Sequence, residues 1–131
     1  MLHDAITEKV LSAAMKVHTG IGAGCLESTY DACLRYQLEK DGVAFGHQVR
    51  LPVVYAGIQI DAGYRIDFLI ENCVILELKA VEKLLPLHVA QVLTYLRLSN
   101  HQVGLLINFN VPHLRDGIRR VMNGYGEPAK S

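Results

Sequence analysis

The chain has 131 residues, half of them hydrophobic, which fits one folded domain and excludes a disordered chain. Lysine plus arginine and aspartate plus glutamate both number 13, and this net charge of zero excludes recognition of a polyanion by bulk positive charge alone. Three cysteines without a C-x-x-C spacing, and no apolar run of about 20 residues, predict a cytoplasmic protein without a disulfide framework, a zinc knuckle or a membrane segment.

The first part of the chain has the hydrophobic spacing of two helices. Residues 4–18 place apolar side chains on one helical face, with Asp4 as the expected N-cap, and this helix is expected to end at residues 19–20. A second helix is predicted for residues 25–40. The glycines of residues 20–24 follow a helix instead of a strand, so we interpret them as an interhelical turn and not as a dinucleotide-binding loop. The predicted buried faces are Ile6, Val10, Ala13, Ala14 and Val17 in the first helix, and Leu26, Tyr30, Cys33, Leu34 and Leu38 in the second.

Extended segments follow the two helices. Residues 44–60 have the composition of strands, with a hairpin turn at residues 56–57. Pro52 has no backbone N–H to donate, which indicates an edge strand or a bulge at that position. Residues 65–70 and 73–79 then form two apolar strands, separated by a polar turn.

A further helix is predicted late in the chain, over residues 87–98. Pro86 suits its first turn, and Asn100 is expected to close it. A last short helix is predicted for residues 112–122, before a frayed tail from about residue 124.

These elements predict a single domain over residues 1–131 of the α/β class. Residues 103–109 form a continuous apolar run, which is typical of a strand buried on both faces. Because a strand, a helix and a strand follow one another, at least one pair of strands must be parallel. We therefore expect a central mixed sheet flanked by helices.

Three ionisable side chains interrupt the two central strands: Asp67, Glu77 and Lys79. Glu77 and Lys79 share one face, because side chains alternate with period two along a strand. The turn decides whether Asp67 joins them. A two-residue turn sets Asp67 opposite Leu76, whereas a three-residue loop at residues 71–73, with a positive φ angle, sets it opposite Glu77.

Only the second register builds a site. Two carboxylates within about 5 Å of each other are unfavourable unless a proton or a cation lies between them. The cation that suits such oxygen ligands is Mg²⁺, with Mn²⁺ as a substitute. The alternative is a solvated sheet face with an ordinary cross-strand ion pair.

Two further motifs accompany these strands. Gly24, Glu27 and Tyr30 spell G-x-x-E-x-x-Y, and Gln91 and Tyr95 lie four residues apart on one helical face. Together with the Asp and Glu-x-Lys pattern of the central strands, they make the chain closely resemble the GxxExxY family of the PD-(D/E)XK nuclease-like superfamily.

The resemblance extends over residues 17–122 and includes non-catalytic stretches such as LPVVYAG. It implies a restriction-endonuclease-like core with a helix, three strands, a helix and a strand, which is compatible with the order expected from the sequence. It also implies a catalytic centre that hydrolyses phosphodiester bonds with Mg²⁺.

The resemblance further implies roles for individual residues. Asp67 and Glu77 would be the metal-binding carboxylates, and the backbone carbonyl of Leu78 is a further candidate ligand. Lys79 would orient or deprotonate the attacking water, or stabilise the charged transition state. Glu27 resembles the helical acid that completes the metal site, directly or through water.

Five residues are candidates for roles around this centre. Gln91 resembles the polar residue on the helix after the Glu-x-Lys strand. Tyr30 and Tyr95 are either base-stacking residues or aromatic residues at the edge of the core. Lys83 and Arg119 could belong to a local phosphate-binding patch, or to a solvated face.

Three functions are compatible with the sequence. The first is a metal-dependent nuclease acting on nucleic acid, with DNA favoured over RNA. The second is a nuclease-fold module that binds nucleic acid without turnover of its own. The third is a protein-interaction domain that forms a homodimer through the sheet edge near Pro52.

Overall fold

The computed structural model describes residues 1–124 and has helices on both sides of a central sheet. The tail after about residue 124, for which fraying is expected, lies outside these residues. In chain order the elements are α1 (Asp4–Ile21), α2 (Glu27–Lys40), β1 (Phe45–Arg50), β2 (Val53–Tyr55), β3 (Ile58–Ile60), β4 (Arg65–Ile70), β5 (Val74–Lys79), α3 (Pro86–Ser99), β6 (Val103–Asn108), the 3₁₀ helix η1 (Leu114–Gly117) and β7 (Ile118–Met122).

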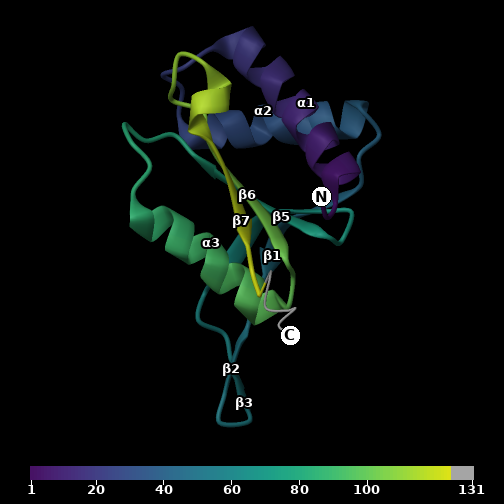
Figure 1. Ribbon diagram of the computed structural model, residues 1–131, viewed down its shortest axis with the longest axis vertical. Coiled ribbons are helices and arrows are strands. Elements are labelled where there is room, and N and C mark those ends of the chain that lie inside the picture. The colour runs from purple at the N-terminus through teal and green to yellow at the C-terminus, as the bar shows by residue number, and fades with distance from the viewer. Residues whose placement is uncertain (125–131) are drawn as a thin grey trace.

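The main sheet has five strands in the order β1-β4-β5-β6-β7. Strands β5 and β6 are parallel and are joined by α3, while the other neighbours are antiparallel. This confirms the predicted mixed sheet flanked by helices. Strands β2 and β3 form a separate hairpin that extends away from the body of the molecule (Figure 1).

Two apolar cores lie on the two faces of the sheet. The larger core packs α1 and α2 against residues such as Phe68 and Leu76. The smaller core packs α3 against residues such as Ile75 and Leu106. Every residue of β6 is buried, as its continuous apolar sequence predicts. Gly104 of β6 allows α3 to pack closely, since a Cβ atom there would lie 2.8 Å from Cγ1 of Val92.

The prediction of a last helix over residues 112–122 is wrong. Residues 112–122 instead contain η1 and strand β7, which pairs antiparallel with β6. Gly117 disfavours a helix through the middle of this segment, and its position leaves no room for a side chain, because a Cβ atom would lie 2.1 Å from the Asn108 carbonyl oxygen. Pairing with the otherwise open edge of β6 satisfies the backbone groups of this segment, and it outweighs the weak helical pattern.

Smaller differences concern the ends of α1 and α2. The N-cap of α1 is His3, and the Asp4 carboxylate instead accepts a hydrogen bond from the N-terminal amine at 2.8 Å. Helix α1 continues beyond Gly20 to Ile21, and its C-cap is Gly22, whose φ of 71° suits glycine. Leu26, expected to be buried, is the N-cap of α2 and is 74% exposed.

Among the helices of residues 1–124, none combines the length and the apolar character needed to span a bilayer.

Candidate active site

The turn between β4 and β5 sets the register of the two central strands. Ile70 pairs with Val74, so the connection is a three-residue loop, and its residues Glu71 and Asn72 have positive φ angles of 48° and 56°. The same register carries Asp67 opposite Glu77. Of the two registers left open by the sequence, the structure has the one that builds a site.

The carboxylates of Asp67 and Glu77 each accept a hydrogen bond from a backbone N–H of the opposite strand. The backbone N–H of Asp67 donates to Oε2 of Glu77 at 2.8 Å, and the backbone N–H of Leu78 donates to Oδ2 of Asp67 at 2.9 Å. The regular backbone pairing of β4 with β5 ends one residue earlier, at Phe68 and Leu76. Beyond that pair, the side-chain carboxylates of Asp67 and Glu77 take the place of backbone carbonyls as hydrogen-bond acceptors between the two strands.

The direction in which the side chains of β4 point changes at Asp67. Phe68 belongs to the core beneath α1 and α2, whereas Ile66 belongs to the core beneath α3. On an uninterrupted strand these two side chains would share one face of the sheet, because they are two residues apart. The change of face places Asp67 at an opening in the sheet.

Strand β1 changes face at the same row. The ring of His47 contacts Phe68 on the α2 side, with ring centroids 5.0 Å apart, but Val49 packs with the α3 core. Gln48 lies between them with a φ of 53°, which is unusual for a residue other than glycine. Its side-chain amide donates to Oδ1 of Asp67 at 3.3 Å. Gln48 is a site residue that the sequence did not reveal, because its positive φ has no signature there.

A cleft of about 590 Å³ opens beside Asp67 and is bounded by α2. Glu27 and Asp31 lie one helical turn apart on the wall of this cleft, and Oδ1 of Asp31 contacts Nε2 of His47 at 2.7 Å. The spacing of Asp31 from Glu27 was the signal that could have identified it. The residues lining the cleft are Glu27, Ser28, Asp31, Ala32, Arg35, Gln48 and Asp67.

Burial makes ionisation of these acids unfavourable. Glu77 is only 7% exposed, and burial, reinforced by the charge of Asp67, raises its pKa to about 9. Burial also raises the pKa of Asp67 and, against the opposing charge of Lys79, the pKa of Glu27. Such shifts are the signature of closely spaced acids in a partly dry site.

Lys79 brings the compensating positive charge. It is half-buried at the end of β5, on the same face as Glu77, and its charge lowers the pKa of Glu77, Asp67 and Glu27. Within residues 1–124 its ammonium group has no carboxylate within ion-pair distance. The ammonium group is therefore available to an anion entering the site.

The chain after Lys79 is fixed by Asn108, which is 2% exposed. Its side chain accepts from the Val81 N–H at 3.0 Å and donates to the Val81 carbonyl at 2.9 Å. Lys79 is directly opposite Asn108 in the parallel pair. This buried amide holds the β5–α3 loop at the edge of the site.

Helix α3 closes the site from the other face of the sheet. Gln91 is exposed and donates to the Tyr95 hydroxyl at 3.2 Å. Tyr95 is 5% exposed, and its ring meets that of Tyr64 edge-on, with centroids 5.6 Å apart. Burial, and then the charge of Glu77, raises the pKa of the Tyr95 hydroxyl, which places this side chain near the carboxylate pair.

Tyr30 lies in the core instead of facing the cleft. It is fully buried, stacks on Phe109 with centroids 4.6 Å apart, and its hydroxyl donates to the Gly22 carbonyl at 2.6 Å. The same hydroxyl accepts from the Cys25 N–H at 3.2 Å. In this position Tyr30 has no surface for stacking on a base; it holds the turn that directs Glu27 toward the cleft.

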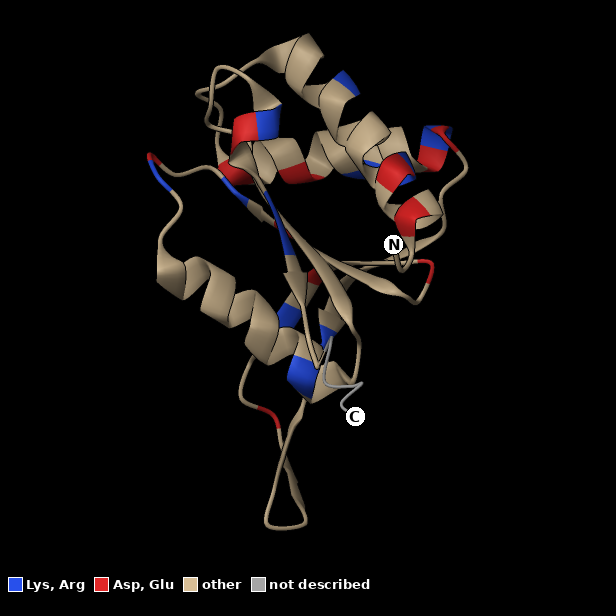
Figure 2. Ribbon diagram, viewed as in Figure 1, with Lys and Arg blue, Asp and Glu red and all other residues tan. Residues whose placement is uncertain are grey.

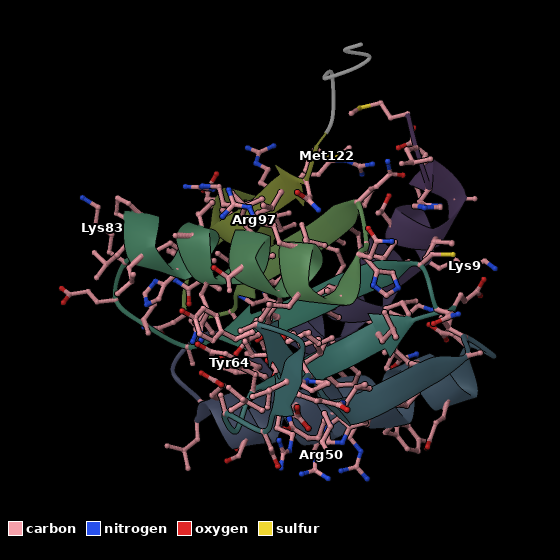
Figure 3. All side chains as sticks on the ribbon, turned by 90° about the horizontal axis from the view of Figure 1, so that it is seen from below. Lys9, Arg50, Tyr64, Lys83, Arg97 and Met122 are labelled. Atoms are coloured by element: carbon pink, nitrogen blue, oxygen red, sulfur yellow. The ribbon has the colours of Figure 1, made fainter. Side chains whose placement is uncertain are left out.

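Lys83 and Arg119 are not brought into the cleft. Lys83 is exposed at the α3 end of the β5–α3 loop and points away from the body (Figure 3). Arg119, expected on a helix, lies on β7 two strands from Glu77, a backbone separation of about 10 Å. Its guanidinium donates to the carbonyls of Asp116 and Ile118 at 3.3 and 3.0 Å.

The chemistry of the donor set suits a hard cation. Within residues 1–124, no group of three or more His, Cys, Asp and Glu side chains is spaced to enclose a metal ion. Mg²⁺, however, commonly binds proteins through one or two carboxylates and keeps several waters. Asp67 and Glu77 supply such a pair, and Glu27 lies close enough to affect the same electrostatic field.

Comparison with known proteins agrees with this geometry. The family model described as the PD-(D/E)XK nuclease superfamily matches residues 4–121, which include every element from α1 to most of β7. The searches of curated proteins and of solved structures found no match. On the strength of the family match, the chain belongs to the PD-(D/E)XK nuclease superfamily.

Proposed function

We propose that this chain is a divalent-metal-dependent nuclease that hydrolyses phosphodiester bonds, with DNA favoured over RNA as the substrate. Superfamily membership supports nuclease chemistry in general. The observation that carries the proposal is the pair of Asp67 and Glu77, each bonded to a backbone N–H, beside Lys79, which has no ion pair within residues 1–124. Within the superfamily, the motif at Gly24, Glu27 and Tyr30 supports assignment to the GxxExxY family.

In the proposed reaction, Asp67 and Glu77 would hold Mg²⁺, with Glu27 and the Leu78 carbonyl as further candidate ligands. The bound ion would neutralise charge on the phosphate and activate water. Oδ1 of Asp67 and Oε1 of Glu77 are the carboxylate oxygens that do not accept the two backbone N–H groups. These oxygens can therefore bind the ion without loss of the bonds that position them.

Lys79 would bind the non-bridging oxygens of the scissile phosphate. Phosphodiester hydrolysis adds a water oxygen to phosphorus, transfers one water proton to solvent or a base, and breaks the bond to one ester oxygen, which leaves with a proton. Negative charge increases on the non-bridging oxygens in the transition state. The ammonium group of Lys79 would stabilise that charge more strongly than it stabilises the ground state.

Gln91 and Tyr95 would act on the α3 side of the carboxylates. The hydrogen bond between them holds the amide of Gln91 beside Tyr95, and from there the amide would donate to water or to a phosphate oxygen. The burial of Tyr95 favours a supporting role over base stacking. Lys83 and Arg119 remain candidates only for contacts with a longer nucleic acid that leaves the cleft.

A nuclease-fold binding module without turnover is the second candidate. The raised pKa of Glu77, to about 9, favours it, because a protonated carboxyl is a poor metal ligand. The zero net charge does not separate the two candidates, since both need local positive charge to bind a polyanion. A cytoplasmic location remains a prediction for either function.

Cleavage of a mixed panel of nucleic acids tests these candidates. Wild-type protein is incubated with single- and double-stranded DNA and RNA in Mg²⁺ or Mn²⁺, and Lys79→Ala is compared with Lys40→Ala, a matched change at an exposed residue of α2. We expect cleavage of DNA by wild type and Lys40→Ala, and a loss of about 10²-fold or more in Lys79→Ala. Binding without cleavage would support the second candidate, and equal cleavage by all three proteins would contradict the proposed site.

A further inference from the structure

The β2–β3 hairpin is an arm that extends beyond the five-stranded sheet (Figure 1). Its two strands pack mainly on each other. The turn residues Ala56 and Gly57 have φ angles of 52° and 79°, as in the tight turns that favour straight hairpins. An isolated two-stranded hairpin is only marginally stable in water, so an arm of this kind gains stability when a surface covers it.

The base of the arm is held firmly. The N–H of Leu51 donates to the Tyr64 carbonyl at 3.1 Å, and Leu51 itself is 5% exposed. Arg50 and Asp61 form an ion pair across the base, and the Gly63 N–H donates to Oδ1 of Asp61 at 3.0 Å. The arm is therefore preorganised, which lowers the entropy lost when it binds.

One face of the arm, called the apolar face below, carries only aliphatic side chains and the aromatic ring of Tyr55. The register pairs Val53 with Ile60 and Tyr55 with Ile58, and paired residues of an antiparallel ladder point to the same face. Tyr55, Ile58 and Ile60 are 72%, 63% and 42% exposed. The opposite face carries Val54 and Gln59. The arm thus has two chemically different faces within one short hairpin.

The arm also carries no charge. Residues 51–60 contain no Asp, Glu, Lys, Arg or His, and the charged residues nearest to them lie at the base (Figure 2). In a two-fold symmetric contact, residues near the axis meet their own copies, so a charge there would be repelled by its twin. The composition of the arm suits a two-fold axis and offers nothing to recognise a charged partner.

We propose that two copies of this chain form a dimer by stacking the apolar faces of their β2–β3 arms about a two-fold axis. The proposal does not depend on the nuclease activity. Aliphatic and aromatic side chains of this size bury about 100–200 Å² each, so two arms together bury about 1,000 Å². That area lies at the lower limit of specific interfaces, so we expect a reversible dimer that forms as the protein concentration rises.

Two substitutions on opposite faces test this dimer. Ile58→Glu and Val54→Glu introduce the same charge at sites of similar exposure, 63% and 68%, but only Ile58 lies on the apolar face. The molecular mass is measured by sedimentation equilibrium from low to high micromolar concentration. We expect wild type and Val54→Glu to dimerise and Ile58→Glu to remain monomeric. Both positions are exposed, and circular dichroism with thermal melting verifies that each variant is folded.

A fluorescence measurement reports on the face itself. The sequence has no tryptophan, so Tyr55→Trp introduces a unique fluorophore on the apolar face, and Val54→Trp introduces one on the opposite face. With rising protein concentration, the emission of Tyr55→Trp should shift to shorter wavelength, whereas that of Val54→Trp should not. A wild type that is monomeric at every concentration, or an Ile58→Glu variant that dimerises like wild type, would overturn the proposal. Loss of the dimer in both glutamate variants would overturn it as well.

Discussion

Asp67 and Glu77 lie opposite each other on adjacent antiparallel strands, and the Asp67 N–H donates to Oε2 of Glu77 at 2.8 Å. Each carboxylate replaces a bond of the backbone ladder, so the acids are held by the sheet itself and not by mobile loops. A site held by strands keeps its geometry before any ligand arrives, which is the condition for electrostatic preorganisation.

The buried carboxyl of Glu77 makes the stability of the metal-free protein depend on pH. Its pKa rises from 4.5 to about 9 on folding, so its contribution to stability is complete below pH 4.5 and is lost as the pH rises through about 9. Metal-free wild type should therefore lose stability between pH 5 and pH 9 relative to Glu77→Gln, which cannot ionise. Urea unfolding with a chelator measures this difference. Parallel pH profiles for the two proteins would contradict it.

Metal binding should have the opposite dependence on pH. A cation binds the ionised carboxylates, so its affinity rises as Asp67 and Glu77 lose their protons. We expect Mg²⁺ or Mn²⁺ to raise the melting temperature of wild type more at pH 8 than at pH 6. Asp67→Asn should lack this rise, while Asp41→Asn, a surface change on the far end of α2, should retain it. An equal rise in both variants would place the metal elsewhere.

Substitutions of Gln48 should affect protein stability and metal affinity in different ways. At its φ of 53° a glycine has no steric penalty, so Gln48→Gly should fold at least as well as wild type. Gln48→Val should be less stable than wild type, because a β-branched side chain disfavours this region more strongly than glutamine does. Both variants lose the amide that donates to Asp67, and both should bind metal more weakly. Calorimetric titration beside urea unfolding measures the two effects. Unchanged metal affinity in Gln48→Gly would show that the amide does not position Asp67.

Tyr30 should affect stability and not substrate binding. Tyr30→Phe leaves the partly buried Gly22 carbonyl without its hydroxyl partner, which should cost about 1–2 kcal/mol of unfolding free energy. The stacking on Phe109 remains, so the variant should fold. Denaturant unfolding and steady-state kinetics measure both properties. A raised KM with unchanged stability would mean that Tyr30 contacts the substrate after all.

Much of the fold follows from local patterns in the sequence. Asn100, for example, ends α3 in the left-handed conformation, with a φ of 60°, as its sequence position predicts. The prediction for residues 112–122 is wrong because the structure of this segment depends on pairing with the open edge of β6, outside the segment itself. Pairing between strands is a property of the whole sheet, and hydrophobic periodicity does not report it.

Part of the candidate site could also be predicted from the sequence. The register that brings Asp67 to Glu77 could be stated as one of two alternatives, and the pairing of Ile70 with Val74 in the structure decides between them. Asp31 could have been assigned from its spacing of one helical turn from Glu27, but Gln48 could not be assigned from spacing on a single element. Gln48 reaches the cleft because β1 and α2 converge there, which is a tertiary relationship.

The most direct test of the central claim is the cleavage of DNA in the presence of a chelator, followed by addition of Mg²⁺, for three proteins. These are wild type, Glu77→Ala, and Glu39→Ala as a matched change at an exposed acid of α2. Wild type and Glu39→Ala should cleave only after Mg²⁺ is added, and Glu77→Ala should not cleave. Cleavage that persists in the chelator, or in Glu77→Ala, would contradict a metal-dependent centre at Asp67 and Glu77.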